Sequence, residues 1–81
     1  MIFTAHITIM PLEDLLDPQG KAVMGGLANL GIESIQDVRI GKHITLQIDA
    51  GNAEQAKEIA TTATKKLLAN QVMEQFEIVI L

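Results

Sequence analysis

The 81-residue sequence contains no cysteine, no tryptophan and no tyrosine, and only two phenylalanines. Without cysteine the chain has no disulfide, no thiolate nucleophile and no thiolate ligand for a metal. The scarcity of aromatic rings removes the stacking surface on which single-stranded nucleic acid usually binds. The formal net charge of -4 and the pI near 4.9 also argue against nucleic acid, because phosphate binding depends on clustered Lys and Arg. We therefore expect no nucleic-acid partner.

Long hydrophobic runs and targeting segments are missing as well. No stretch approaches the roughly 18 consecutive apolar residues that a membrane-spanning helix needs. The start of the chain, Met1 to Met10, lacks the basic flank and the long apolar segment of a signal peptide. We therefore expect a cytoplasmic protein without a membrane partner, consisting of one domain over residues 1–81.

Apolar side chains, by contrast, are abundant. Hydrophobic residues make up 48% of the sequence, and the mean hydropathy is +0.28. A monomer of this length buries only about 60 to 65% of the surface of its unfolded chain, so this composition would leave many hydrophobic groups exposed. We interpret the excess as surface that is buried against other subunits, and we predict a homo-oligomer.

Three stretches alternate apolar and polar residues with the period of a β-strand. Ile2 to Met10 predicts a strand, and Gln36 to Ile48 predicts a hairpin with its turn at Gly41-Lys42. Glu74 to Leu81 predicts a last strand whose end is apolar on both faces and therefore needs burial on both sides. The predicted inner faces of these strands consist of Phe3, Ala5, Ile7, Ile9, Val38, Ile40, Ile44, Leu46, Ile48, Phe76, Ile78 and Ile80.

A first helix is predicted from Asp17, which can accept from the free amides at the helix start, to about Leu30. Pro18 suits its first position and Gly31 can end it in the left-handed conformation. Its predicted buried stripe consists of Val23, Leu27 and Leu30. The pair Gly25-Gly26 costs about 1 kcal/mol per residue against alanine, so we expect a neighbouring backbone to approach closely there.

A second helix is predicted to begin after Asn52, which forms a capping box with Gln55, while Gly51 supplies the preceding turn. Asn70 can end this helix. Its predicted inner face consists of Ala56, Ile59, Ala60, Ala63 and Leu67. The element order β-α-β-β-α-β predicts an α+β fold of ferredoxin-like type, with two helices on one face of a four-stranded sheet.

Complete catalytic sets are not visible in the sequence. His6 and His43 lie on the polar faces of two predicted strands and can approach if the strands pair, but without Asp or Glu at ligand spacing we favour a structural or solvated role over metal binding. Gly41-Lys42 lacks the other residues of a phosphate loop. The acidic group Glu13, Asp14 and Asp17 is interpreted as solvated loop charge instead of a magnesium site. We therefore assign no catalytic, cofactor-binding or metal-binding residue.

Several segments together are specific for one family. They read L-D-P-Q-G-K-A at 16–22, L-G at 30–31, V-R-I-G-K at 38–42 and K-L-L-A-N at 66–70, followed by Val72 and Glu74. In this order they cover most of the chain, and the sequence resembles the PurS small subunit of phosphoribosylformylglycinamidine synthase. His43, where an aromatic residue often follows Gly-Lys, and Met10-Pro11 depart from the family pattern.

The resemblance implies a non-catalytic accessory subunit in purine biosynthesis. In that family a glutaminase subunit releases ammonia, a large synthetase subunit uses ATP and Mg to amidate formylglycinamide ribonucleotide, and the small protein holds the two together. It also implies a homodimer or tetramer, often with strand segments exchanged, and no cofactor in this chain. A regulatory module of the ACT type, which uses the same element order to bind an amino acid, is the alternative.

Four polar residues in or beside the matching segments are candidate contacts to the partner subunits. They are Arg39, Lys42, Lys21 and Asn70. Arg39 is the only arginine of an acidic chain, and a guanidinium offers a planar fork to a carboxylate across an interface. The competing interpretation is that Arg39 and Lys42 are solvated charges that pair with Asp37 or Glu33.

Overall fold

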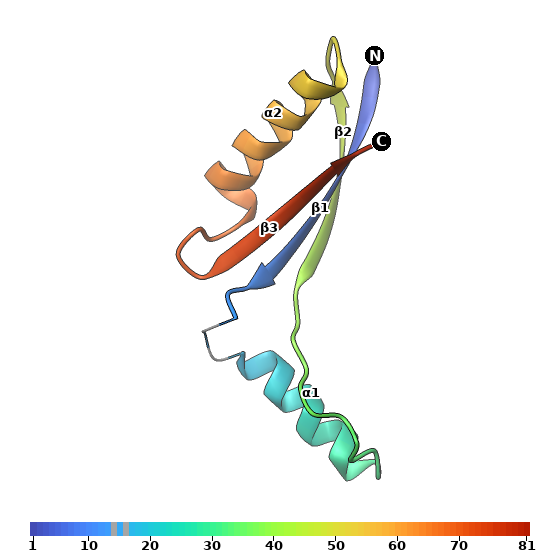
Figure 1. The fold of residues 1–81 in the computed structure, drawn as a ribbon, viewed down its shortest axis with the longest axis vertical. Helices are drawn as coiled ribbons and strands as arrows, with labels where there is room; N and C mark the ends of the chain where they lie inside the picture. Colours follow the sequence, from blue (N-terminus) through green and yellow to red (C-terminus); the bar gives the residue numbers. More distant parts are fainter. Residues whose placement is uncertain (14, 16) are drawn as a thin grey trace.

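The computed structural model describes residues 1–13, 15 and 17–81, and it has the α+β class that the sequence predicts. Figure 1 shows a twisted sheet with one helix along it and a second helix extending from its end. The elements in chain order are β1 (Ile2–Pro11), α1 (Pro18–Asn29), β2 (Lys42–Asp49), α2 (Ala53–Ala63), a π-helical turn η1 (Thr64–Leu68) and β3 (Glu74–Ile80).

The sheet has three antiparallel strands in the order β2-β1-β3, so the predicted fourth strand is wrong for the described residues. Gln36 to Ile40 is extended but belongs to no ladder, and Gly41-Lys42 is not a hairpin turn, because the chain continues directly into β2. The β1–β2 ladder begins at the pair Ile9 and Lys42. A side chain at Gly41 would collide with the Ile9 carbonyl and Met10, so this glycine permits close passage past β1 instead of a reversal.

The core lies between one face of the sheet and α2 (Figure 1). Ala5, Ile7 and Ile9 of β1 are fully buried there, as the alternation predicts. Ala56 and Ala60 of α2 meet this face, and such small side chains let the helix approach the strands closely. The other predicted inward residues of β2 and β3 are buried or half-buried around this centre.

The capping box at the start of α2 is confirmed. Asn52 Oδ1 accepts from the Gln55 amide at 2.8 Å, and Gln55 Oε1 accepts from the Gly51 amide at 2.6 Å. The inner face predicted for this second helix is wrong at two positions, because Ile59 is 42% exposed and Leu67 is 84% exposed.

The π-helical turn η1 accounts for the exposure of Leu67. A π turn holds more residues than an α turn, so each residue rotates less around the axis and the inward position moves to a later residue. Thr64, whose hydroxyl donates to the Ala60 carbonyl at 2.8 Å, is fully buried, and Leu68 and Ala69 pack against the core in place of Leu67.

The first helix and the strand-like segment after it form a projection, which we call the arm (residues 18–40). Asp17, Pro18 and Gly31 act as predicted: Asp17 caps α1, Pro18 begins it, and Gly31 follows it with φ +87°. Figure 1 shows that α1 extends beyond the end of the sheet, with residues 32–40 running back along it. The predicted buried stripe is therefore wrong, since Val23 is 43% and Leu30 is 78% exposed.

The close backbone approach predicted at Gly25-Gly26 is found at Gly20 instead. A Cβ at Gly25 or Gly26 would meet no atom of the described chain within 4 Å. A Cβ at Gly20 would collide with the Val38 carbonyl, so the return segment of the arm passes directly over the first turn of α1. Within α1, only Gly20 is buried.

The arm makes the molecule elongated. Its radius of gyration is 16.2 Å, whereas a compact chain of this length has about 12 Å. It exposes 5765 Å², against roughly 4,800 Å² for a compact monomer of 8.8 kDa. The end of β3 is exposed too, with Val79 at 54% and Leu81 at 74%, so the burial predicted for both faces of this strand is not provided by the chain itself.

We predict that Gly20→Ala lowers the free energy of unfolding by about 1–3 kcal/mol, because a methyl group there must displace the backbone at Val38. Gly25→Ala is the matched control: its methyl meets open space within the chain, and alanine favours a helix by about 0.5–1 kcal/mol over glycine. Urea denaturation of both variants at equal protein concentration measures the difference. Equal stability of the two variants would show that the Gly20 contact does not matter.

Candidate functional site

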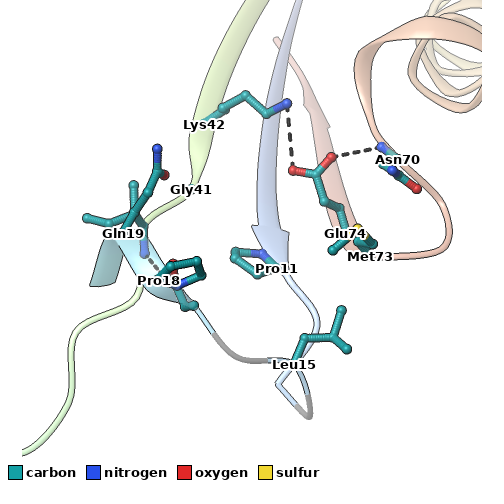
Figure 2. A pocket seen from close by; sticks show the side chains of 11 residues that line it. Pro11, Leu15, Pro18, Gln19, Gly41, Lys42, Asn70, Met73 and Glu74 are labelled. Carbon is teal, nitrogen blue, oxygen red and sulfur yellow. Dashed lines mark hydrogen bonds and ion pairs between the residues drawn. The ribbon is translucent and has the colours of Figure 1, made fainter. Parts of the chain in front are cut away.

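The candidate site is a hollow of about 300 Å³ where the arm joins the sheet, which we call the junction. Figure 2 shows that its walls come from the end of β1, the start of α1, the start of β2 and the turn before β3. Those segments contribute Pro11, Pro18, Ile40, Lys42, Asn70, Met73 and Glu74. Two of the four predicted contact residues, Lys42 and Asn70, thus lie together here, and Arg39 is next to the lining residue Ile40.

The Asp17 carboxylate holds the two halves of the arm together. Its Oδ1 accepts from the Gly20 amide at 3.1 Å, and its Oδ2 accepts from the Ile40 amide at 2.8 Å. The hydrogen bonds from the Ile40 and Gly20 amides, together with the nearby Arg39 charge, lower the pKa of Asp17 below its ordinary value of 3.8 against the opposing effect of desolvation. The ionised side chain therefore joins the helix start to a residue 23 positions later.

Arg39 has a partner within the chain that the sequence did not predict. Its guanidinium Nη2 donates to the Pro11 carbonyl at the end of β1. Pro11 has no amide of its own to bond, and this contact satisfies its carbonyl while attaching the return segment of the arm to the sheet. The described ion pairs do not include Asp37 or Glu33 as partners of Arg39.

Lys42 and Asn70 meet at the carboxylate of Glu74, and Figure 2 shows both interactions as dashed lines. Glu74 Oε1 accepts from the backbone amide of Asn70 at 2.8 Å, and Glu74 Oε2 lies 3.6 Å from Lys42 Nζ. Asn70 Oδ1 also accepts from the Val72 amide at 3.0 Å, so its side chain shapes the turn before β3. Lys42 Nζ also donates to the Leu68 carbonyl at 3.5 Å, and the side chain remains 53% exposed.

Lys21 lies outside the junction. It lines a second hollow, which shares Asp17 with the junction and is also lined by Glu13, Asp37 and Arg39. Of the predicted acidic group, Glu13 and Asp17 border this hollow, while Asp14 lies outside the described residues, as does Leu16 of the L-D-P-Q-G-K-A segment. Lys21 and Lys42 therefore border different hollows.

The surface of the junction is suited to contact with another protein chain. Its two carboxylates are already engaged, Asp17 by backbone amides and Glu74 by Lys42. The remaining hydrogen-bonding and apolar surface can contact another chain. Over residues 1–13, 15 and 17–81, no group of three or more His, Asp or Glu side chains is arranged to hold a metal ion. None of the described helices is long and apolar enough to cross a membrane.

Residues 4–81 match the protein family described as PurS: phosphoribosylformylglycinamidine (FGAM) synthase. The chain belongs to the PurS family. Curated relatives agree: the subunit PurS of phosphoribosylformylglycinamidine synthase from Mycobacterium leprae is 42% identical over 91% of this chain and 90% of the relative. The corresponding protein from Synechocystis is 41% identical over 88% of this chain and 69% of the relative.

Solved structures place the whole PurS-family chain in the same fold. A chain in the structure of PurLQS from Thermotoga maritima has a TM-score of 0.91 and 31% identity, covering 100% of this chain and 99% of that one. PurS from Bacillus subtilis has a TM-score of 0.89 and 32% identity, with 98% of each chain covered. The arm is thus shared with these proteins, because the comparisons extend over nearly all residues. The ACT alternative finds no support in these relatives.

Two residues of the junction were missed as site residues in the sequence. The sequence identifies Asp17 as a helix cap and as part of an acidic group, but its second bond, to Ile40, has no signal in the local pattern. Glu74 was recognised only as the start of a strand, although it pairs with Lys42 from 32 positions away. Both are carboxylates at element boundaries, which is the one local signal that could have suggested them.

We predict that stability at neutral pH decreases from wild type to Asp17→Asn to Asp17→Ala. Asparagine has one acceptor oxygen and keeps the cap while losing the bond to Ile40, whereas alanine loses both. Because folding lowers the pKa of Asp17, its contribution is fully present above pH 3.8 and decreases as the pH falls through the lowered pKa.

Chemical denaturation over a series of acidic pH values checks this dependence. The difference between wild type and Asp17→Ala should shrink only below pH 3.8. Asp37→Asn, at an exposed carboxylate of the same arm, is the control and should change little. A wild-type advantage that persists unchanged through the acid range would contradict the assigned role of the carboxylate.

Proposed function

We propose that this PurS-family chain is a non-catalytic accessory subunit of phosphoribosylformylglycinamidine synthase in cytoplasmic purine biosynthesis. The observation that carries the proposal is the match of residues 4–81 to the PurS family together with the full-length similarity to a chain of the Thermotoga maritima PurLQS structure. The chain bridges a glutaminase subunit, which releases ammonia from glutamine, and a synthetase subunit, which uses ATP and Mg to amidate formylglycinamide ribonucleotide.

The junction supports a bridging role. It is a concave surface assembled from both halves of the molecule, so a partner that contacts it touches the sheet and the arm together. Lys42 presents a half-exposed ammonium group at its rim, and Met73, 52% exposed, presents an adaptable apolar side chain. Charged and apolar groups in one hollow are typical of contact sites between proteins.

The elongated shape supports a homo-oligomer in which the arm is covered by a second copy. The roughly 1,000 Å² of surface in excess of a compact monomer is similar to the 800 Å² that each partner buries in a standard interface. Exposed apolar side chains are frequent on the arm, with Leu30 at 78%, Ile32 at 45% and Ile35 at 37%. A strand-like segment outside any ladder can pair with the edge of another sheet, which favours a dimer with exchanged segments.

We predict that the chain alone neither hydrolyses glutamine nor consumes ATP, and that adding it to the glutaminase and synthetase subunits of the same organism enables glutamine-dependent amidation. Sizing chromatography of the three proteins and an assay for the amidated product measure this. Turnover of either substrate by the pure chain, or full glutamine-dependent activity without it, would reject the accessory role.

The same reconstitution tests the candidate contacts. Lys42→Ala and Glu74→Gln break the same ion pair, but only Lys42→Ala removes the exposed cation, so only it should weaken assembly. Arg39→Ala should also weaken assembly, and here part of the effect comes from releasing the Pro11 carbonyl. An equal loss in Lys42→Ala and Glu74→Gln would mean that the ion pair matters only for folding, while no loss in either would place the contact elsewhere.

We predict that the isolated chain is at least a dimer by light scattering at micromolar concentration, and that Leu30→Glu and Ile35→Glu reduce its mass without unfolding it. Both side chains are exposed within the chain, so a charge there disturbs only a contact to another copy. Leu67→Glu is the matched control for Leu30→Glu, because Leu67 is 84% exposed and Leu30 78%, and Leu67 lies outside the arm. Monomeric wild-type protein, or dissociation by Leu67→Glu alone, would contradict oligomerisation through the arm.

A further inference from the structure

The two histidines of the chain lie together on the sheet face opposite α2, and neither lines the junction. His43 of β2 pairs with Thr8 of β1, and His6 is two residues before Thr8, so the two rings are diagonal neighbours across adjacent strands. His6 Nδ1 and His43 Nε2 are 3.3 Å apart, and the ring centroids are 5.5 Å apart at an interplanar angle of 37°. One nitrogen of each ring therefore lies next to a nitrogen of the other ring.

Fold stability gives little reason for this arrangement. At 3.3 Å the two nitrogens form at most a long hydrogen bond, and a bond of this kind on the surface contributes little to stability. Both rings border solvent, where water can satisfy their nitrogens without any contact between them. The observed distance does, however, match the separation of two nitrogens on one tetrahedral ion, since bonds of about 2.0–2.1 Å to Zn²⁺ place two ligands about 3.3–3.4 Å apart.

Thr8 orients one of the two rings. Its Oγ1 is 3.4 Å from His43 Nδ1, on the side of the imidazole away from His6. If Nδ1 carries the proton and donates to this hydroxyl, Nε2 is left unprotonated beside His6, and this is the tautomer that a metal ligand requires. β3 flanks β1 on the side away from β2, and its Glu77 pairs with Thr8. Glu77 therefore adds negative charge to the same sheet face.

We propose that His6 Nδ1 and His43 Nε2 together bind one divalent transition-metal ion, with water in the remaining coordination positions. Imidazole nitrogens favour Zn²⁺, Cu²⁺ and Ni²⁺, whereas Mg²⁺ prefers oxygen ligands. The site is thus separate in place and in chemistry from the Mg used with ATP by the synthetase subunit. It forms only when β1 and β2 pair in the observed register, because the two residues are 37 positions apart.

Isothermal titration of the tag-free protein, in its own oligomeric state, with ZnCl₂ tests the proposal. We expect one ion per chain, no detectable binding of MgCl₂, and affinity at least about 10-fold lower in His6→Gln and in His43→Gln, because each variant leaves a single imidazole without the chelate. Each single variant should already lose most of the affinity, so the double variant should bind Zn²⁺ about as weakly as the weaker single variant. Circular dichroism establishes that each variant is folded.

Nitrogen NMR of the imidazoles supplies a second readout that does not depend on substitution. On addition of Zn²⁺, the resonances of His6 Nδ1 and His43 Nε2 should shift as ligating nitrogens while His43 Nδ1 keeps its proton. Thr8→Val should weaken binding, and Thr45→Val, at a neighbouring threonine of the same face, should not. Zinc binding that is unchanged in both single histidine variants, or the absence of binding in the wild type at millimolar ZnCl₂, would overturn the proposal.

Discussion

The Asp17 carboxylate is the interaction on which the shape of this protein depends. One oxygen satisfies a free amide at the start of α1, and the other accepts from Ile40, where the chain leaves the arm and enters the sheet. Hydrogen bonds to an ionised group are stronger than those between neutral groups, so a single side chain can define the angle of the arm. The adjacent Arg39 to Pro11 contact attaches the same crossing to β1. Gly20 makes this geometry sterically possible, because any larger residue would occupy the space of the Val38 carbonyl.

An arm held away from the sheet has an energetic consequence. The apolar side chains of residues 18–40 obtain little burial from their own chain, while the sheet and α2 enclose a small core of alanine and isoleucine. A domain of this size is already close to the limit of independent stability. A structure that exposes still more apolar surface gains stability from any partner that covers this surface.

The junction and the histidine pair depend on two different features of the sheet. At the junction, Lys42 and Glu74 approach from the two outer strands around the end of β1, and their position depends on where each strand begins. At the histidine pair, the relevant geometry is the diagonal between neighbouring strands, which depends on register. A shift of one residue in either ladder would turn these side chains to the opposite face.

The sequence by itself determined what is local. Alternation identified the inner faces of the three strands, and Asp17, Asn52 and Gly31 identified helix ends, because strand periodicity, capping and left-handed backbone each involve only a few neighbouring residues. The family segments added the assignment to PurS. Only the tertiary structure decided that residues 36–40 leave the sheet, that α1 extends beyond it, and that the π turn brings Leu68 inward in place of Leu67. It also decided the pairing of Asp17 with Ile40, Lys42 with Glu74 and His6 with His43, since bonds between groups 23 to 37 positions apart depend on register and packing that no local pattern contains.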